Sequence, residues 1–495
     1  MAIQTTLARI REARLAKVDK LREMGINPYP SVGKKDCDIA EILNRFGEFD
    51  GKELVLAGRL MSWREHGALV FGDLMDRSGR LQIIIKKDGL ASGDSQKQIL
   101  GFDELTLLDV GDFVEVAGII TKSSSGEISI EAKEIKLLTK SIRSLPEKYK
   151  GLRDSELIFR RRYLDLVMNP ERREMFVRKS NFWAKSRQFM GEHGFMEVET
   201  PVLEHVTGGA DAKPFVTHHN ALDEDFYLRI STELYQKRLI GGGFEKIYTL
   251  GPNFRNEGID DEHLQEYTQL EWYWAYANYR DNMGLVRDIF RHLAHEVYGK
   301  AEFEAHGHKF NLDADWYEID YVSEISDKLG VNVLSDPEDK MLDVIKSHGV
   351  ELGGGAVNRA RLADNLWKII RKDVAGPAFL VNTPKFVSPL AKSMADKPEL
   401  TERFQVIIAG SELGNGYSEL NDPMEQLERF EDQQKAREAG DEEAQMMDED
   451  YVEMLEYGMP PTSGFGMSER VFWFLEGVAA REGVFFPQMR RKKNK

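Results

Sequence analysis

The sequence is almost free of cysteine, because Cys37 is the only one among 495 residues. One cysteine forms no intramolecular disulfide, and the chain has no Cys/His cluster with the spacing of a zinc site. We therefore expect a protein of the reducing cytoplasm, without structural zinc.

Long apolar runs are missing as well. No stretch of about 18 or more apolar residues is present, and a membrane-spanning helix needs about that length. The first residues also lack the apolar core of a signal peptide. The sequence thus predicts a protein that is neither secreted nor membrane-spanning and that has no membrane partner.

Net positive charge is lacking too, since 67 basic side chains stand against 84 acidic ones and the formal net charge is -17. This balance argues against indiscriminate binding to nucleic acid or anionic membranes, although a local basic face is compatible with it. Residues 7–24 predict an amphipathic basic helix. That helix could face RNA or pack on the body of the protein.

Residues 54–138 consist of short β-rich runs separated by glycine-containing turns. Their alternating apolar residues are typical of half-buried strands. Five such strands fit a barrel of the OB type, whose curved face binds single-stranded nucleic acid through aromatic stacking and polar groups. Another small sandwich fits the periodicity almost as well. The expected strands span residues 54–58, 69–74, 81–85, 113–120 and 128–132.

The rest of the chain mixes helices and strands without regular alternation and contains no G-x-G-x-x-G motif. This disfavours a doubly wound nucleotide-binding fold and favours an α+β domain on an antiparallel sheet. We expect a helix over 172–193, ended by Gly194, and a strand over 195–201, ended by Pro201. The acidic stretch 425–456 is expected to be a solvated helical face without chemistry.

Domain boundaries follow from these patterns. We expect the basic helix and its lead-in at 1–50, the barrel at 51–143, a linker at 144–170 and the larger domain at 171–495. Apolar residues at helical spacing within 336–372 indicate a peripheral helical insertion.

The most informative stretch surrounds Arg255. Two runs of alternating apolar residues, 246–250 and 267–273, predict a hairpin whose loop 251–266 carries Arg255. A planar guanidinium binds an anionic oxygen through paired charge-assisted hydrogen bonds, so Arg255 is a candidate phosphate ligand. For an isolated Arg-x-Glu, a surface ion pair between Arg255 and Glu257 is the commoner explanation.

Three motifs in order favour the phosphate ligand. They are a strand that ends at Pro201, then Phe254-Arg255-Asn256-Glu257, then Gly464-Phe465-Gly466 followed by Glu469-Arg470. Together they resemble the three signatures of class II aminoacyl-tRNA synthetases. Further strings resemble those of class II lysyl-tRNA synthetases: Thr207-Gly208-Gly209-Ala210, Pro214-Phe215, residues 217–223, Glu233-Leu234-Tyr235 and residues 414–422. The likeness runs from about residue 50 to 490 and includes the barrel.

The resemblance implies a fold and an activity. The fold would be α+β, with an N-terminal five-stranded OB-type β-barrel followed by a class II catalytic domain on an antiparallel sheet flanked by helices. The enzyme would activate L-lysine with ATP to lysyl-adenylate and pyrophosphate, and then transfer lysine to the 3′ end of tRNA(Lys). The alternatives are a lysyltransferase paralog that modifies a protein, or a non-catalytic RNA-binding or regulatory protein on this scaffold.

The resemblance also assigns an ATP site. Arg255 would hold the α-phosphate, Glu257 the adenine side and His263 the phosphate tail. Tyr267 and Arg470 would enclose the purine, and Arg255, Glu257 and Arg470 would be the catalytic residues. Because the lysine carboxylate itself attacks the α-phosphate, positioning and electrostatics would supply most of the rate.

For the amino acid, the resemblance implies that Glu233 meets the α-ammonium and Glu419 the ε-ammonium. An anionic pocket suits a doubly cationic substrate, because an unpaired buried ammonium is costly. Aspartyl and asparaginyl enzymes share the fold, but they would be expected to place a cation where Glu419 stands. The wall of the pocket would be completed by Gly209, Glu271, Tyr273, Asn415 and Tyr417.

The remaining implied partners are the tRNA and a second copy of the chain. In the barrel, Phe71 would stack on an anticodon base, while Arg64, Gln82 and Glu134 would read base edges. Pro201 and its helix would lie at a two-fold interface, so the expected assembly is a homodimer.

Three positions depart from the family pattern. The last motif, 464–470, is one residue shorter than usual, and 264–267 reads Leu-Gln-Glu-Tyr where Asn-Pro-Glu-Phe is usual. Two glutamates usually share the magnesium ions, whereas here Glu412 stands with Gln405. A neutral amide oxygen is the weaker ligand for a hard cation. The expected cofactor is nevertheless Mg²⁺, held by Glu412 and Gln405.

Overall fold

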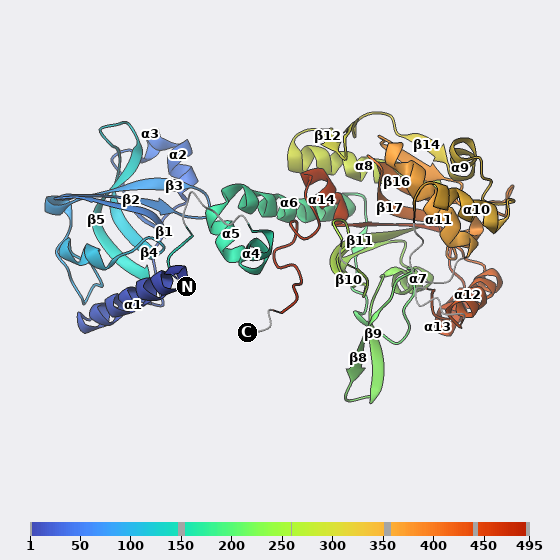
Figure 1. The fold of residues 1–495 in the computed structure, drawn as a ribbon, viewed down its shortest axis with the longest axis horizontal. Helices are drawn as coiled ribbons and strands as arrows, with labels where there is room; N and C mark the ends of the chain where they lie inside the picture. The colour runs from blue at the N-terminus through green and yellow to red at the C-terminus, as the bar shows by residue number, and fades with distance from the viewer. Residues whose placement is uncertain (1, 147–153, 259, 351–357, 439–443, 492–495) are drawn as a thin grey trace. The chain divides into compact units, whose positions relative to one another are not determined.

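The structure is a computed structural model that describes residues 2–146, 154–258, 260–350, 358–438 and 444–491. The chain forms two compact units, Met1–Asp154 and Ser155–Lys495 (Figure 1). No helix in these described ranges is long and apolar enough to cross a membrane.

The strands of the first unit are β1 (Glu53–His66), β2 (Leu69–Met75), β3 (Arg80–Lys86), β4 (Phe113–Lys122) and β5 (Ile128–Thr139). They close into a barrel with the order β1-β2-β3-β5-β4, in which only β3 and β5 pair in parallel. Alternate residues such as Leu56 and Leu60 of β1 point inward and form the core with Ile83 and Val116. The predicted OB-type barrel is confirmed, although its strands extend beyond the predicted runs. Two 3₁₀ helices, η1 (Lys87–Gly89) and η2 (Asp103–Leu107), lie in the connection to β4.

The residues before the barrel pack on it and form no separate lead-in. They contain α1 (Ala2–Glu23), α2 (Ile39–Asn44) and α3 (Phe46–Phe49). Leu21 of α1 and Ile39 of α2 are fully buried in the same apolar core as the barrel strands. Burial of apolar surface therefore joins 1–50 to 51–143 as one unit.

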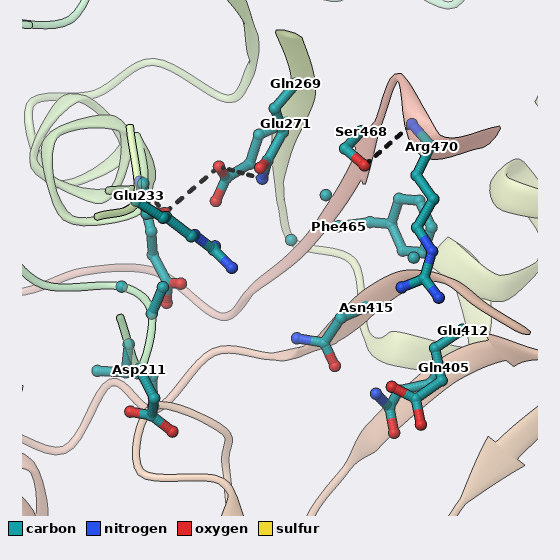
Figure 2. A pocket seen from close by; sticks show the side chains of 18 of the residues that line it. Asp211, Glu233, Gln269, Glu271, Gln405, Glu412, Asn415, Phe465, Ser468 and Arg470 are labelled. Carbon is teal, nitrogen blue, oxygen red and sulfur yellow. Dashed lines mark hydrogen bonds between the residues drawn. The ribbon is translucent and has the colours of Figure 1, made fainter. Parts of the chain in front are cut away.

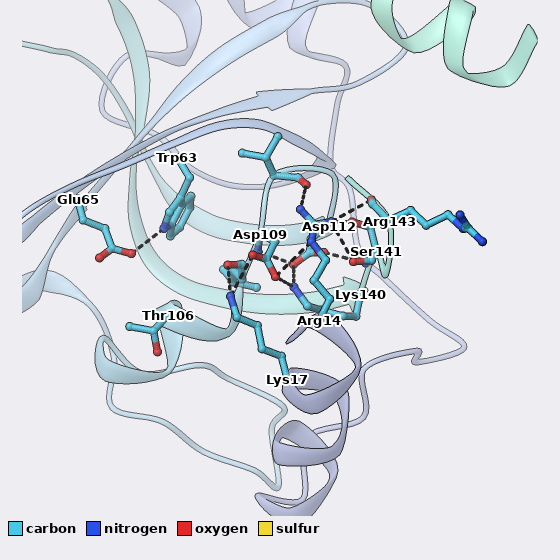
Figure 3. Close-up of polar contacts among 12 residues, drawn as sticks. Arg14, Lys17, Trp63, Glu65, Thr106, Asp109, Asp112, Lys140, Ser141 and Arg143 are labelled. Carbon is cyan, nitrogen blue, oxygen red and sulfur yellow. Dashed lines mark hydrogen bonds and ion pairs between the residues drawn. The ribbon is translucent and has the colours of Figure 1, made fainter. Parts of the chain in front are cut away.

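A buried ion network holds α1 against the barrel (Figure 3). Lys140, directly after β5, is fully buried, and its Nζ lies 2.7 Å from Asp112 Oδ2 and 2.5 Å from Asp109 Oδ2. Arg14 and Lys17 of α1 reach Asp109 at 3.8 and 3.0 Å. Burial raises the pKa of Asp109, but Lys140 and Lys17 lower it more, so that it lies below its usual value. The basic helix was expected either to face RNA or to pack on the body of the protein. Arg14 and Lys17 pack on the body.

We predict that Lys140→Met strongly destabilises the protein, because it leaves the carboxylates of Asp109 and Asp112 without their buried partner. Breaking a buried pair from one side costs about 3 to 5 kcal/mol. Lys86→Met is the matched control, since Lys86 pairs with Glu131 at 2.7 Å on the barrel surface, with 54% of the lysine side chain exposed, and should cost less than about 1 kcal/mol. Urea unfolding followed by circular dichroism measures both changes, and equal losses would contradict the account.

The sheet of the second unit consists of β6 (Met196–Glu197), β10 (Lys246–Phe254), β11 (Glu266–Ala275), β14 (Tyr317–Asp320), β15 (Ala378–Val381), β16 (Arg403–Ile408), β17 (Ser411–Ser418) and β18 (Thr462–Ser468). These eight strands have the order β14-β15-β16-β17-β18-β11-β10-β6. The inner pairs are antiparallel. The prediction of an antiparallel sheet is wrong at both edges, where β14 runs parallel to β15 and β6 parallel to β10. The sheet is therefore mixed.

The predicted hairpin is present, but its loop is shorter than expected. Strand β10 continues through Gly251 and Pro252 to Phe254, which pairs with Glu266 of β11. Pro252 is tolerated there because β6 pairs with β10 only near Tyr248, so the missing N–H faces an unpaired edge. The predicted strand over 195–201 shrinks to β6.

Helices cover both faces of this sheet (Figure 1). One face carries α6 (Pro170–Glu192), α8 (Tyr279–Tyr298) and α14 (Arg470–Glu476); the other carries α7 (Glu233–Gly241), α12 (Pro423–Glu438) and α13 (Glu449–Tyr457). Trp272 of β11 packs with Phe290 of α8, whereas Tyr273 packs with Ile240 of α7 and Tyr451 of α13. Consecutive strand residues thus belong to opposite layers.

The long helices begin and end where the sequence signals them. Asn169 precedes α6, Pro170 occupies its first turn, and Gly194 follows with a φ of 79°. The predicted helix over 172–193 is therefore confirmed. The side chain of Asn278 caps α8 by accepting from the main-chain N–H groups of Arg280 and Asp281.

The expected insertion at 336–372 is helical in its described part and lies next to α9 (Tyr321–Leu329). It contains α10 (Glu338–Ser347), α11 (Arg359–Ile370) and η3 (Arg371–Asp373), while 351–357 lie outside the described residues. It is not peripheral. Trp367 is buried with Leu380 of β15 and Ile407 of β16, and its Nε1 donates to Glu412 Oε1 at 3.0 Å.

Two further predictions need correction. Within the expected linker 144–170, α4 (Ser155–Arg160) and α5 (Arg162–Met168) belong to the second unit, where the fully buried Arg162 donates to Asp165 at 2.8 Å. Residues 147–153 lie outside the described ones. The acidic stretch forms α12 and α13, but Tyr451 is fully buried, so the stretch also covers the sheet.

Short elements complete the second unit. They are a three-stranded sheet of β7 (Leu203–Glu204), β9 (Glu224–Leu228) and β8 (Phe215–His219), a hairpin of β12 (Glu302–Ala305) and β13 (His308–Asn311), and η4 (Lys385–Val387).

Candidate active site

One cavity of about 380 Å³ opens on the sheet of the second unit, between β11, β17 and β18. Every residue to which the sequence analysis assigned ATP, lysine or magnesium lines it. These residues are Gly209, Glu233, Arg255, Glu257, His263, Tyr267, Glu271, Tyr273, Gln405, Glu412, Asn415, Tyr417, Glu419 and Arg470. Figure 2 shows Arg470, Glu412 and Gln405 at one end and Glu233 and Glu271 at the other.

Strand β18 makes room for the cavity because it presents glycines where its neighbours present side chains. Gly464 lies between Tyr273 of β11 and Tyr417 of β17, and Gly466 lies between Glu271 and Asn415. A Cβ on Gly464 would lie 2.5 Å from Glu419 Oε1 and 2.5 Å from a ring carbon of Tyr273. Strand β18 therefore adds no side chain between those of β11 and β17 at these two positions, which leaves room for the cavity.

The first end of the cavity holds Arg470 together with the carboxylates of Glu262 and Glu412, and Arg255 and Tyr267 also line the cavity. Arg255 follows β10, its main-chain N–H donates to Gln265 at 2.8 Å, and its guanidinium lies 5.5 Å from the ring centre of Tyr267. Arg470 begins α14 and forms an ion pair with Glu262 of the hairpin loop. Burial lowers the pKa of Arg470 and the charge of Glu262 opposes this, so the side chain remains a cation at neutral pH.

The opposite end is anionic, and its carboxylates are held by hydroxyl groups. Glu271 accepts from Tyr273 at 2.7 Å and from Thr232 at 2.8 Å, while Glu233 accepts from Tyr417 at 2.5 Å. Burial raises the pKa of Glu271, and the charge of Glu233 adds to the rise. This end is thus prepared to receive positive charge.

Glu419 lies deepest, with an exposed fraction of 1%. Its Oε2 forms an ion pair with Lys237 of α7, while its Oε1 forms no ion pair among the described residues, and neither oxygen accepts a hydrogen bond from them. Burial raises the pKa of Glu419 well above its usual value, Lys237 opposes the rise and Glu233 adds to it. A buried carboxylate oxygen without a partner is costly, so Oε1 is suited to a cationic ligand.

The two residues expected to hold magnesium lie side by side in the cavity (Figure 2). Glu412 Oε1 already accepts from Trp367, and Arg371 Nε lies 3.8 Å from it. Within the described part of the chain, no three His, Cys, Asp or Glu residues gather to form a metal site. One carboxylate and one amide fit an ion that takes most of its other ligands from phosphates and water, as Mg²⁺ does.

In the barrel, cross-strand pairs bring three of the four predicted anticodon residues onto one face. Arg64 of β1 lies opposite Phe71 of β2, and Gln82 lies opposite Asp73, two residues beyond Phe71. Gln82 is nearly buried and its amide donates to Glu127 at 2.8 Å. Glu134 lies on β5 opposite Ala117 of β4.

Comparison with known proteins identifies the family. Residues 154–490 match the family described as tRNA synthetases class II (D, K and N), and residues 54–138 match the OB-fold nucleic acid binding domain. The lysine–tRNA ligase of Thermotoga maritima is 43% identical over 98% of this chain and 97% of its own length. Those of Fervidobacterium nodosum and Moorella thermoacetica are each 42% identical over 97% of this chain and 94% and 97% of their own lengths.

The chain belongs to the class II lysine–tRNA ligase family. The resemblance drawn from the sequence is thereby confirmed, as is the combination of an OB-fold domain with a class II synthetase domain.

Three features of this ligase-family site escape sequence reasoning. Glu262 forms an ion pair with Arg470. This ion pair holds the Arg470 side chain at the cavity, in addition to the stacking on a purine that the resemblance implies. Arg403 donates to Asn415 Oδ1 at 2.7 Å and so fixes that amide. Lys237 does not line the cavity but pairs with two carboxylates that do. Only its four-residue spacing from Glu233 on α7 could have indicated it.

We predict that Gly464→Ala impairs use of the amino acid, because the new methyl group would collide with Glu419 and Tyr273. The KM for the amino acid should rise by roughly tenfold or more, with the KM for ATP nearly unchanged, because a misplaced contact in a packed site costs on the order of 1 to 3 kcal/mol. The control is Gly284→Ala in α8, where a Cβ meets no atom within 4 Å. Steady-state kinetics would contradict the assignment if both variants behaved alike.

Proposed function

We propose that this protein is a lysine–tRNA ligase that activates L-lysine with ATP, releases pyrophosphate, and transfers lysine from lysyl-adenylate to the 3′ end of tRNA(Lys). The observation that carries the proposal is one cavity that is lined both by two arginines and an aromatic ring and by a cluster of buried carboxylates. ATP and a dicationic amino acid need these two environments side by side.

At the anionic end, Glu233 receives the α-ammonium of lysine and Glu419 the ε-ammonium. The unpartnered Oε1 of Glu419 supports the second contact. Glu271, Tyr273, Asn415, Tyr417 and Gly209 form the wall, and all of them line the cavity.

At the other end, Arg255 holds the α-phosphate, and Tyr267 and Arg470 flank the adenine with Glu257 beside it. His263 holds the phosphate tail; its ring N–H lies 2.8 Å from Asp260, which orients it. Mg²⁺, when bound by Glu412 and Gln405, would screen the charge of the triphosphate.

The reaction requires little acid–base catalysis by the protein. The lysine carboxylate attacks the α-phosphorus, the bond to the bridging oxygen breaks, and pyrophosphate leaves. Arg255 and Arg470 offset the charge that develops on the phosphates, and fixed contacts at both ends hold the reacting atoms in line. The ion pairs and hydrogen bonds around the cavity support such preorganisation.

Of the alternatives, a lysyltransferase paralog that modifies a protein is disfavoured by the barrel, which such paralogs lack. A non-catalytic RNA-binding or regulatory protein is disfavoured because both ends of the cavity keep their charged side chains. Aminoacylation of purified tRNA separates these possibilities.

We further propose that the barrel binds the anticodon through Phe71, Arg64, Gln82 and Glu134, and that the second unit forms the catalytic domain of a homodimer with Pro201 near its two-fold interface. Exposed apolar side chains near Pro201, namely Met196, Val202 and Leu203, support an interface there. The single cysteine supports a reducing cytoplasmic location.

The direct test is ATP–pyrophosphate exchange measured with each amino acid in turn. The proposal predicts exchange that depends on L-lysine. Exchange without lysine, or a preference for aspartate, would refute it.

The variant Glu419→Gln tests the pocket assignment. We expect kcat/KM for lysine to fall roughly 30-fold or more, because a buried ammonium loses its charged partner, while the KM for ATP changes less than about threefold. The KM for ATP serves as the internal control for this variant. Equal loss of both substrates would mean that Glu419 does not face lysine.

The variant Phe71→Ala tests the barrel. Base stacking is worth about 1 to 3 kcal/mol, so the KM for tRNA should rise roughly fivefold or more while lysine-dependent exchange, which needs no tRNA, stays normal. Phe71→Trp, which keeps an aromatic face, is the control. Unchanged tRNA kinetics in Phe71→Ala would remove Phe71 from the proposed interface.

A further inference from the structure

The buried ammonium group of Lys237 pairs with Glu233 and Glu419, two carboxylates of the proposed lysine pocket, from outside the cavity. Its Nζ lies 2.5 Å from Glu233 Oε1 and forms an ion pair with Glu419 Oε2. The rings of Tyr417 and Tyr451 lie 5.5 and 5.9 Å away. Lys237 is completely buried and is not among the residues that line the cavity. A substrate could therefore enter without displacing it.

The geometry assigns one oxygen of Glu419 to Lys237 and leaves the other for the ammonium group of a substrate. Oε2 forms an ion pair with Lys237, whereas Oε1 forms no ion pair among the described residues, and neither oxygen accepts a hydrogen bond there. Oε1 also lies against Gly464, which lines the cavity, since a Cβ there would lie 2.5 Å from it. A carboxylate held on one side by a fixed ammonium has only its other oxygen to offer, and the direction of that oxygen is fixed.

Charge counting gives Lys237 a second role. Three carboxylates, Glu233, Glu271 and Glu419, line this end of the cavity and are each almost completely buried. When all three are ionised, the ammonium of Lys237 reduces their charge from three to two negative charges. The two ammonium groups of a bound lysine would balance these two negative charges, as burial in a low-dielectric site requires, while its carboxylate is directed to the α-phosphate of ATP.

We propose that Lys237 is a specificity-determining positioning residue, which orients Glu419 toward the ε-ammonium and matches the charge of the pocket to that of a dicationic amino acid. This inference rests on the proposed lysine activation. Lys237 acts through Glu233 and Glu419 and does not itself touch the substrate.

A purely structural ion pair would have different consequences. Loss of a structural pair would lower stability and impair both substrates together. Loss of an orienting counter-cation leaves Glu419 surrounded by like charge, so that it takes up a proton and no longer distinguishes an ammonium from a methyl group. The two roles are therefore separable by substrate and by pH.

The experiment compares Lys237→Met with wild type in lysine-dependent ATP–pyrophosphate exchange. We expect kcat/KM for lysine to fall at least about 30-fold, with the effect mainly in the KM for lysine and the KM for ATP within about threefold of wild type. The selectivity for lysine over norleucine, which ends in a methyl group, should fall with it. Lys185→Met is the matched control, because Lys185 pairs with Glu296 at 2.7 Å on the surface of α6. It should leave all constants unchanged.

A pH profile adds a second readout. The charged and titratable groups that face Glu419 are Lys237 and Glu233 of α7, Glu271 and Tyr273 of β11, Tyr417 of β17 and Tyr451 of α13. With Lys237 removed, only negative or neutral groups remain, so Glu419 ionises at higher pH. In Lys237→Met the KM for lysine should therefore decrease between about pH 6.5 and about pH 8.5, whereas in wild type it should change little.

Further variants keep the test decisive if Lys237→Met does not fold. Lys237→Gln should show the same loss of lysine selectivity, and Lys237→Arg, which keeps the charge, should retain most of it. Wild-type selectivity and a flat pH profile in the neutral variants would overturn the inference while leaving the proposed function intact. An absence of lysine-dependent exchange in the wild type would instead refute the proposed function.

Discussion

The cavity depends on holding several carboxylates out of contact with water. Glu233, Glu271 and Glu419 gather at its anionic end, where burial disfavours their charge. Hydroxyl groups donate to Glu233 and Glu271, and the ammonium of Lys237 pairs with Glu233 and Glu419. The surrounding architecture serves this arrangement, since α7 supplies Lys237 from beneath and β18 keeps glycine where any side chain would fill the pocket.

The two ends of the cavity are built by different parts of the chain, and their separation explains how one site can bind unlike substrates. The hairpin of β10 and β11 and the start of α14 bring Arg255, Tyr267 and Arg470 to the cavity. Strands β11 and β17 carry Glu271, Tyr273 and Tyr417 of the anionic end, whereas Glu233 begins α7 and Glu419 directly follows β17. Since β11 runs through both, residues only four apart, Tyr267 and Glu271, serve the two ends on the same face of one strand.

Much of the site could be predicted from sequence, because ordered motifs carry the residues that line the cavity. The barrel could be predicted as well, since five alternating runs are a strong local pattern. Contacts between distant segments could not. Lys237 has an ordinary helical sequence around it, and its partner Glu419 lies in another part of the chain, so only the fold brings them together. The ion pair of Arg470 with Glu262 could not be predicted from the sequence for the same reason.

Errors in the predicted fold have similar physical origins. Alternation reports which face of a strand is buried but not the direction of its neighbour, so the parallel edges formed by β6 and β14 were not visible. Gly251 and Pro252 resemble turn residues, yet they continue β10 where its edge is unpaired. The insertion seemed peripheral because its links to the cavity, from Trp367 and Arg371 to Glu412, join segments that are far apart in the sequence.

The most direct test of this account is a crystal structure of the wild-type protein with L-lysine and a non-hydrolysable ATP analogue. The account predicts the ε-ammonium of lysine about 2.8 Å from Glu419 Oε1, with the Nζ of Lys237 still between Glu233 and Glu419. Lysine bound away from Glu419, or Lys237 displaced from the pair by the substrate, would contradict it.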